Sequence, residues 1–262
     1  MQILSFIDPL RAILDSASKA ILEIYQDPNR FEVDRKSDNS PLTAADRASN
    51  DIICRGLEAL NPSLPIVSEE SIEVHYKVRS KYDYFWMVDP LDGTKEFIRR
   101  NGEFTINVAL IHQTRAVLGC ILVPVSGELF IGIDGKGARR YKGEEFHLMS
   151  CRNFREDAPA LNLVCSRSHL NDQTKEYVSN FNEPVMLPRG SALKFTVLAA
   201  GEADIYPRLG PTMEWDTAAA QIILEEAGGS LLEWESREPL QYNKSSLLNP
   251  NFIAFGNGVL SY

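Results

Sequence analysis

The chain has 262 residues, of which 44% are hydrophobic and 24% are charged. These values are ordinary for a folded soluble protein and exclude global disorder, and the length suits one large α/β domain or two fused subdomains. The formal net charge of −9 disfavours a nucleic-acid-binding module, which would need a basic surface. No apolar run in the sequence approaches the roughly 18 residues that a membrane span requires.

The first residues, MQILSFIDPLRAIL, lack the basic segment, apolar block and small-residue cleavage site of a secretory signal. We therefore expect a cytoplasmic protein without a stable membrane span. The sequence leaves open the oligomeric state and a peripheral association with the cytoplasmic side of the inner membrane.

The N-terminal part begins with two predicted helices. Residues 1–27 carry apolar side chains at steps of three and four, which is the spacing of an amphipathic helix. Thr43, with Asp46 three residues later, predicts the start of a second helix through a capping box.

Predicted strands follow these helices. The apolar runs at 65–67 and 84–88 have strand length. The second run is expected to stop at Asp89, because Pro90 should force the chain out of the sheet. Residues 104–141 form alternating β-rich segments separated by turn residues, which predicts an antiparallel meander.

After a polar break, the segment LNLVCS begins a second α/β half. Its helices are predicted at 173–182, 191–201 and 216–227, and the segments LLEW and FIAFG are predicted strands. We expect an N-terminal α+β subdomain at 1–155 with most of the metal ligands and a C-terminal α/β subdomain at 156–262, with no linker between them.

The acidic motif Asp89-Pro90-Leu91-Asp92-Gly93-Thr94 follows the second predicted strand. Two carboxylates three residues apart around a turn can converge on one point, together with the Leu91 carbonyl, and such oxygen ligands suit Mg²⁺. A helix that starts after Gly93 would place free N–H groups, and so an anion site, beside the metal. The alternative is an ordinary turn with an Asx cap and a glycine at positive φ.

Two further carboxylates favour the metal interpretation. Glu69 ends a short apolar strand, and Asp216 follows Trp215 at the head of a predicted helix. Taken alone, Asp216 could simply be the N-cap of that helix. Carboxylates at strand and helix ends in both halves are what a cation site in a cleft between subdomains would require.

Three motifs, in this order, resemble the inositol monophosphatase superfamily of Mg²⁺-dependent, Li⁺-sensitive phosphatases: Ser68-Glu69-Glu70, VDPLDGT at 88–94 and EWDTAAA at 214–220. The chain is also similar to the CysQ-type 3′(2′),5′-bisphosphate nucleotidases in the segments DGTKEFIRRNGEFTINVALI, SRSHL, GSALKF and ADIYPRLGPTMEWDTAA. The resemblance implies a layered αβαβα sandwich of the α/β (α+β) class. It also implies hydrolysis of the 3′-phosphate of adenosine 3′,5′-bisphosphate, or of its sulfated form, in sulfur metabolism and nucleotide recycling.

The resemblance also assigns metal ligands, for two or three Mg²⁺ ions in all. One Mg²⁺ would be held by Glu69, Asp89 and the Leu91 carbonyl. Another would be held by Asp89, Asp92 and Asp216. Two such ions can stabilise the attacking and the leaving oxygens of an in-line displacement.

The catalytic residues implied by the resemblance are Asp46, Thr94 and Glu69. Thr94 and Asp46 match a Thr–Asp dyad that orients the attacking water and accepts its proton. The amides of Gly93 and Thr94 would cradle the phosphate oxygens.

Substrate selection is expected in the second half of the chain. Lys194 and Arg208 are candidates for a second phosphate. Ser191, which opens the same predicted helix as Lys194, could donate alongside free N–H groups, and His169 would contact the nucleotide. The alternatives are a solvated helix charge for Lys194 and an ordinary loop residue for His169. Lys36 matches a family lysine near the metals, with a mobile loop residue as the alternative. The full substrate-binding set implied is Glu69, Leu91, Asp92, Gly93, Thr94, His169, Ser191, Lys194, Arg208 and Asp216.

The sequence leaves two alternative functions open. An inositol or sugar phosphate phosphatase would share the chemistry but would be indifferent to the loss of Lys194 or Arg208. A non-catalytic metal- or nucleotide-binding regulator on the same fold would need a damaged Glu69, Asp46 or Thr94, and all three are intact.

Overall fold

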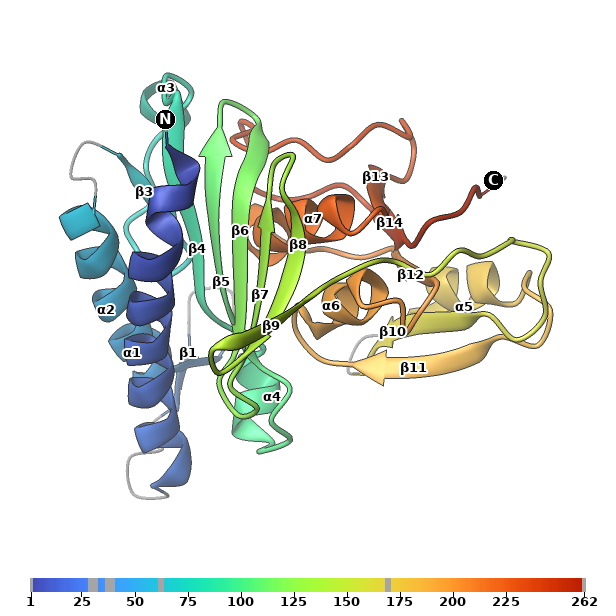
Figure 1. The fold of residues 1–262 in the computed structure, drawn as a ribbon, viewed down its shortest axis with the longest axis horizontal. Coiled ribbons are helices and arrows are strands. Elements are labelled where there is room, and N and C mark those ends of the chain that lie inside the picture. The colour runs from blue at the N-terminus through green and yellow to red at the C-terminus, as the bar shows by residue number, and fades with distance from the viewer. Residues whose placement is uncertain (1, 28–32, 36–40, 61–63, 168–170, 261–262) are drawn as a thin grey trace.

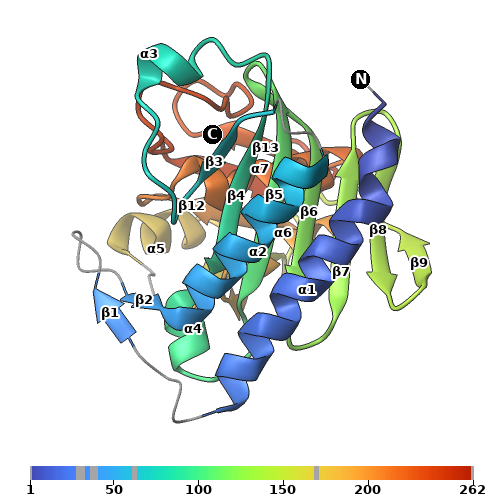
Figure 2. The same ribbon diagram turned by 90° about the vertical axis from the view of Figure 1, so that its left-hand side faces the viewer.

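The computed structural model describes residues 2–27, 33–35, 41–60, 64–167 and 171–260. The elements form five layers, as Figures 1 and 2 show: two long helices, a seven-stranded sheet, two further helices, a five-stranded sheet and one outer helix. Three clusters of buried hydrophobic side chains fill the spaces between these layers. The predicted αβαβα sandwich is therefore confirmed.

The first layer consists of α1 (Ile7–Gln26), preceded by the short 3-10 helix η1 (Ile3–Phe6), and α2 (Ala44–Leu60). The amphipathic helix predicted at the N-terminus is confirmed. Its buried face packs on the seven-stranded sheet through Leu10, Leu14, Ala17 and Ile21.

The start of α2 is fixed by the predicted capping interaction. The Thr43 N–H donates to Asp46 Oδ2 at 2.8 Å, and the Ala45 N–H donates to Thr43 Oγ1 at 3.2 Å. Thr43 ends the small hairpin of β1 (Val33–Arg35) and β2 (Pro41–Thr43), so the hairpin leads directly into the helix.

The seven-stranded sheet has the order β3-β4-β5-β6-β7-β8-β9, and every pair except β3–β4 is antiparallel. The predicted meander is thus confirmed. Its strands are β3 (Ile66–Ser68), β4 (Tyr84–Asp92), β5 (Thr105–His112), β6 (Arg115–Val123), β7 (Glu128–Ile133), β8 (Gly137–Lys142) and β9 (Glu145–Leu148). Along β5, Val108 and Leu110 face the first layer, while Ala109 faces the central helices.

The central layer consists of α6 (Leu193–Ala199) and α7 (Glu214–Glu226). Helix α7 lies directly on the seven-stranded sheet because Gly119 has no side chain, and a Cβ there would be 2.3 Å from the Ala219 carbonyl oxygen. The helix ends in a Schellman motif, in which the Gly229 N–H donates to the Leu224 carbonyl at 2.9 Å.

The five-stranded sheet has the order β11-β10-β12-β14-β13 and is mixed. Its strands are β10 (Asn162–Ser166), β11 (Val185–Arg189), β12 (Ile205–Arg208), β13 (Ser230–Glu233) and β14 (Phe252–Phe255), and α5 (Asp172–Val178) covers its outer face. Strands β11 and β12 were not predicted. Each contains a proline, Pro188 or Pro207, which argues against a strand. Strand β12 pairs with β10 only at Ile205, so Pro207 interrupts no ladder on that side.

Three predicted boundaries are corrected. Helix α5 ends at Val178 rather than at 182. Helix α6 begins at Leu193 rather than at 191, because Ser191 has a positive φ of 51° and cannot continue a right-handed helix. Helix α7 begins at Glu214 rather than at 216. We retain the division near residue 155 as a proposal, since residues 66–148 build one sheet and residues 162–255 the other.

The remaining short helices are α3 (Tyr76–Arg79) and α4 (Thr94–Ile98). Among the helices that the structure describes, none is both long enough and apolar enough to cross a bilayer.

Candidate metal and phosphate site

Strand β4 delivers both carboxylates of the acidic motif. The prediction that it stops at Asp89-Pro90 is wrong: the strand continues to Asp92 with a register shift. Asp89 pairs with Asn107 and Asp92 pairs with Thr105, so three steps along β4 match two along β5. Strand β4 therefore has one more residue than β5 over this stretch, which is a β-bulge. A bulge tolerates Pro90 because the hydrogen bonding between the strands is already interrupted there.

The bulge brings the two carboxylates to the same point as the first turn of α7. One carboxylate oxygen from each of Asp89, Asp92 and Asp216 lies within 4.8 Å of the other two. Asp89 is buried and the other two are half-buried. Because these three side chains offer only oxygen donors, the cluster fits a hard divalent cation.

The acids of the cluster repel one another. Burial raises the pKa of Asp89 well above its ordinary value, and the charges of Glu69 and Asp92 raise it further. Burial also raises the pKa of Asp216 to about 8, with the charges of Asp92 and Glu69 adding to the effect. Glu69 is therefore close enough to influence the cluster, although it is not one of the three acids that meet within 4.8 Å. A bound cation would offset this repulsion.

Thr94 and Asp46 lie together, as the predicted dyad requires. The Thr94 hydroxyl donates to Asp46 Oδ1 at 3.2 Å. The other oxygen, Oδ2, accepts from the hydroxyl of Thr43 at 2.5 Å and from its N–H at 2.8 Å. The capping role of Asp46 and its contact with Thr94 thus use different oxygens, so one carboxylate serves both.

Gly93 precedes α4 in the left-handed region, with a φ of 93°. A Cβ at this position would lie 3.2 Å from the Glu103 carbonyl oxygen and 3.2 Å from Ser191 Cβ. Glycine is therefore required both by its conformation and by the close approach of two other segments. The helix that follows begins at Thr94, as predicted.

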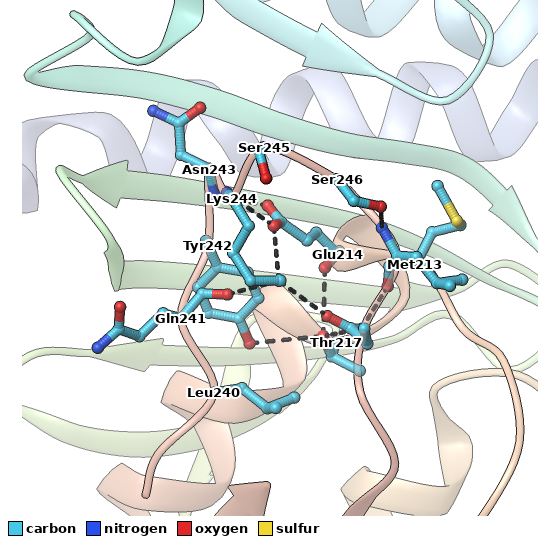
Figure 3. Close-up of polar contacts among 12 residues, drawn as sticks. Met213, Glu214, Thr217, Leu240, Gln241, Tyr242, Asn243, Lys244, Ser245 and Ser246 are labelled. Carbon is cyan, nitrogen blue, oxygen red and sulfur yellow. Dashed lines mark hydrogen bonds and ion pairs between the residues drawn. The ribbon is translucent and has the colours of Figure 1, made fainter. Parts of the chain in front are cut away.

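Asp216 stands in the first turn of α7 but is not its N-cap. The N-cap is Met213, whose N–H donates to Asp216 Oδ2 at 2.8 Å. Glu214, fully buried, holds this turn in place by accepting from the N–H of Asn243 at 2.6 Å and from Lys244 Nζ at 2.6 Å. Figure 3 shows Glu214 facing Lys244, with Asn243 beside them.

The cluster opens into a cleft of about 690 Å³, a volume within the usual range for small-molecule sites. The cleft is lined from the first half by Glu69, Asp92, Gly93 and Thr94 and from the second half by Ser191, Lys194, Arg208 and Asp216. The structure therefore places three of the predicted metal residues (Glu69, Asp92 and Asp216) and eight of the ten predicted substrate residues around one cleft.

Ser191 and Lys194 line this cleft and are buried. The Ser191 hydroxyl donates to Asp92 Oδ2 at 2.8 Å, and Lys194 Nζ donates to the Ser191 carbonyl. The ammonium group lies 5.7 Å from the centre of the Tyr206 ring. Burial and the charge of Arg208 lower the pKa of Lys194, although Asp92 acts in the opposite direction. The alternative of a solvated helix charge for Lys194 is therefore wrong.

Two predicted residues fall outside the described ranges. Lys36 belongs to 36–40 and His169 to 168–170. Their proposed roles stay predictions from the sequence.

Other residues at the site were not predicted. Ser49 of α2 donates to the Pro90 carbonyl at 2.7 Å and so ties the bulge to the first layer. Thr105 Oγ1 lies 2.5 Å from Ser191 Oγ and donates to Asn107 Oδ1 at 2.9 Å. The available signal was the polar pair Thr105 and Asn107 in an otherwise apolar strand, since buried polar side chains need partners.

A layered α/β fold with carboxylates gathered at its strand and helix ends defines a class of metal-dependent enzymes. The chain belongs to the inositol monophosphatase family, whose model matches residues 5–258.

The comparisons also find relatives at higher similarity. The chain is 41% identical over 237 residues to the 3′(2′),5′-bisphosphate nucleotidase CysQ of Salmonella typhimurium, an alignment that covers 90% of this chain and 94% of the relative. The CysQ of Escherichia coli K12 is 40% identical over 247 residues, covering 94% and 98%. A crystal structure of CysQ from Bacteroides thetaiotaomicron matches with a TM-score of 0.83 and 39% identity, covering 95% and 97%.

Proposed function

We propose that this protein is a Mg²⁺-dependent 3′(2′),5′-bisphosphate nucleotidase that converts adenosine 3′,5′-bisphosphate to AMP and orthophosphate. The observation that carries the proposal is the composition of the cleft, which combines an acidic cluster with the cations Lys194 and Arg208. Such a cleft suits a ligand with two phosphates, one engaged through metal and one by direct ion pairing. The relatives named CysQ support this choice of substrate.

The residues proposed to hold the metal are Glu69, Asp89, Asp92 and Asp216 with the Leu91 carbonyl, for two or three ions. When bound, Mg²⁺ supplies charge stabilisation for the transferring phosphoryl group and activates water. Burial, together with repulsion between the neighbouring carboxylates, raises the pKa of Asp89 and Asp216, and a cation at this point would offset both effects.

Thr94 and Asp46 are proposed to handle the proton of the attacking water. Water attacks phosphorus as the ester P–O bond breaks, and the sugar hydroxyl leaves with a proton. The Thr94 hydroxyl, which donates to Asp46 Oδ1, would orient the water, and Asp46 would accept the proton it loses. The amides of Gly93 and Thr94 would hold the phosphate oxygens.

The second phosphate is assigned to Lys194 and Arg208. Lys194 is a buried point charge held by the Ser191 carbonyl, and Arg208 Nη2 donates to the Pro211 carbonyl at 2.9 Å, which leaves its other donors for a ligand. Ser191 links this part of the cleft to the metal ligand Asp92.

The test is phosphate release from adenosine 3′,5′-bisphosphate with Mg²⁺, with EDTA, and with added Li⁺. We expect release that requires Mg²⁺, is inhibited by Li⁺ and yields AMP. Asp92→Asn should lower turnover at least about a hundredfold, because a lost metal ligand removes a charge that cannot be replaced by a neutral amide, while thermal unfolding changes little. A near-normal rate in Asp92→Asn, or release that is unaffected by EDTA, would contradict the proposal.

A further inference from the structure

Three segments that are far apart in the sequence meet at the Glu103 side chain. Arg167, at the end of β10, donates from Nε to Glu103 Oε2 at 2.8 Å and from Nη2 to Glu103 Oε1 at 2.7 Å. The Gly190 N–H, after β11, donates to the same Oε2 at 2.8 Å. Arg167 also donates to the Pro188 carbonyl at 3.1 Å. One carboxylate of the first half thus binds two segments of the second half.

The packing around Gly190 leaves little freedom for movement. A Cβ at Gly190 would lie 2.8 Å from the Glu103 carbonyl oxygen and 2.7 Å from Glu96 Cγ. The next residue, Ser191, has a positive φ of 51°, which is an unfavourable conformation for a residue other than glycine. Contacts made by its neighbours therefore hold Ser191 in this conformation.

Ser191 is the link between this arrangement and the cleft. Its hydroxyl donates to Asp92, and its carbonyl accepts from Lys194 Nζ. A shift of Gly190 would consequently move the serine hydroxyl and the anchor of the lysine ammonium together.

We propose that Glu103 and Arg167 form a clamp that positions Ser191 and Lys194 and thereby sets the preference for a nucleotide with a second phosphate. The choice of substrate in this inference rests on the proposed function. Glu103 is a positioning residue here, because it acts through Gly190 and Ser191 and lies outside the reacting groups.

The carboxylate of Glu103 keeps its charge at neutral pH. Partial burial acts to raise its pKa, but the hydrogen bonds from Arg167 and Gly190 outweigh this effect, and the pKa is lowered. A charge-assisted, two-pronged Arg–carboxylate pair fixes geometry as well as distance, which suits a positioning role.

The kinetic test compares adenosine 3′,5′-bisphosphate with adenosine 3′-monophosphate, which lacks the second phosphate. In Glu103→Ala and Arg167→Ala we expect the ratio of kcat/KM for the two substrates to fall about tenfold, mainly through KM for the bisphosphate, because the misplaced lysine no longer meets the second phosphate. Glu103→Gln, which can still accept from Gly190, should lie between these variants and the wild type. In the double variant, the ratio of kcat/KM should fall no further than in the more affected single variant.

Arg155→Ala is the matched control. Arg155 makes an equivalent two-pronged pair with Asp157, at 3.0 and 2.9 Å, and both side chains are exposed. The loss of this pair should leave the ratio of kcat/KM for the two substrates unchanged. An equal fall in kcat/KM for both substrates in the Glu103 and Arg167 variants would overturn the clamp and would indicate a general structural role.

A second measurement needs no substrate. Hydrogen exchange of the peptide at 187–194 should be about tenfold faster in Glu103→Ala, the change expected when a hydrogen bond to a charged group is lost, and unchanged in Arg155→Ala. Unchanged exchange at 187–194 would overturn the clamp. If the wild type does not hydrolyse the bisphosphate, the proposed function fails, and the exchange result still decides the clamp.

Discussion

Asp92 connects the two halves of the molecule through a single oxygen. Its Oδ2 accepts from Ser191 Oγ at 2.8 Å, and Asn107 Nδ2 approaches it at 3.4 Å. The sequence predicted that Asp92, Asp89 and Asp216 converge, and the cluster confirms that they do. It could not predict that Ser191 would bind Asp92, because no local pattern specifies a contact across 99 residues.

The acidic cluster makes the stability of the metal-free protein depend on pH. The pKa of Asp216 is raised from its ordinary 3.8 to about 8, so its protonated form favours the folded state. This contribution is complete below about pH 4, where both states bind the proton, and is lost as pH rises through about 8. Mg²⁺ competes with the proton, so its stabilising effect should grow over the same range.

Thermal unfolding between pH 5 and pH 8.5, with EDTA or with Mg²⁺, tests this linkage. We expect the gap in Tm between the two conditions to widen as pH rises. In Asp216→Asn, the Tm measured in EDTA should fall less with rising pH than the Tm of the wild type, because the amide carries no charge. Parallel curves for both proteins in EDTA would contradict the account.

At the scale of elements, the position of α7 depends on contacts beyond the helix itself. Glu214 is fully buried in its first turn and is paired with Lys244, whose side chain is 30% exposed. Figure 3 shows this pair, and Glu214 belongs to the same first turn of α7 as Asp216. The sequence predicted this helix but placed its start too late, at 216 rather than at Glu214.

Lys244→Met should destabilise the fold by about 3 kcal/mol, because it leaves a buried carboxylate without its cation. The measurement is urea unfolding monitored by circular dichroism. Lys175→Met is the control: its partner Asp172 is exposed, so the loss should stay below about 1 kcal/mol. Equal effects of the two substitutions would show that the Glu214 pair does not anchor α7.

The sequence predicted the strands of the meander but not β11 and β12. The meander was recognisable because β5, β6 and β7 are apolar runs separated by short turns. Strand β11 is half-exposed or exposed throughout and contains Pro188, while β12 has only four residues and contains Pro207. Their place in the sheet is set by pairing with β10 and β14, which is a tertiary effect.

For the whole molecule, the family resemblance carried by the motifs predicted the five layers, and the acidic residues predicted a site between the halves. What the motifs did not predict is how the halves are held together at the cleft. The segments NGEFT, SRSH and GSALK are separate in the sequence, yet Glu103, Arg167 and Gly190 from these segments form one set of hydrogen bonds. Such contacts follow from the packing of both sheets on α6 and α7.

The central claim is that this cleft selects a nucleotide with two phosphates. The most direct measurement is the ratio of kcat/KM for adenosine 3′,5′-bisphosphate to that for inositol 1-phosphate, with Mg²⁺ present. We predict a ratio of at least about a hundred, because the inositol ester offers no second phosphate to Lys194 and Arg208. A preference for inositol 1-phosphate would contradict the account, leaving the metal cluster but removing the roles given to His169, Ser191, Lys194 and Arg208.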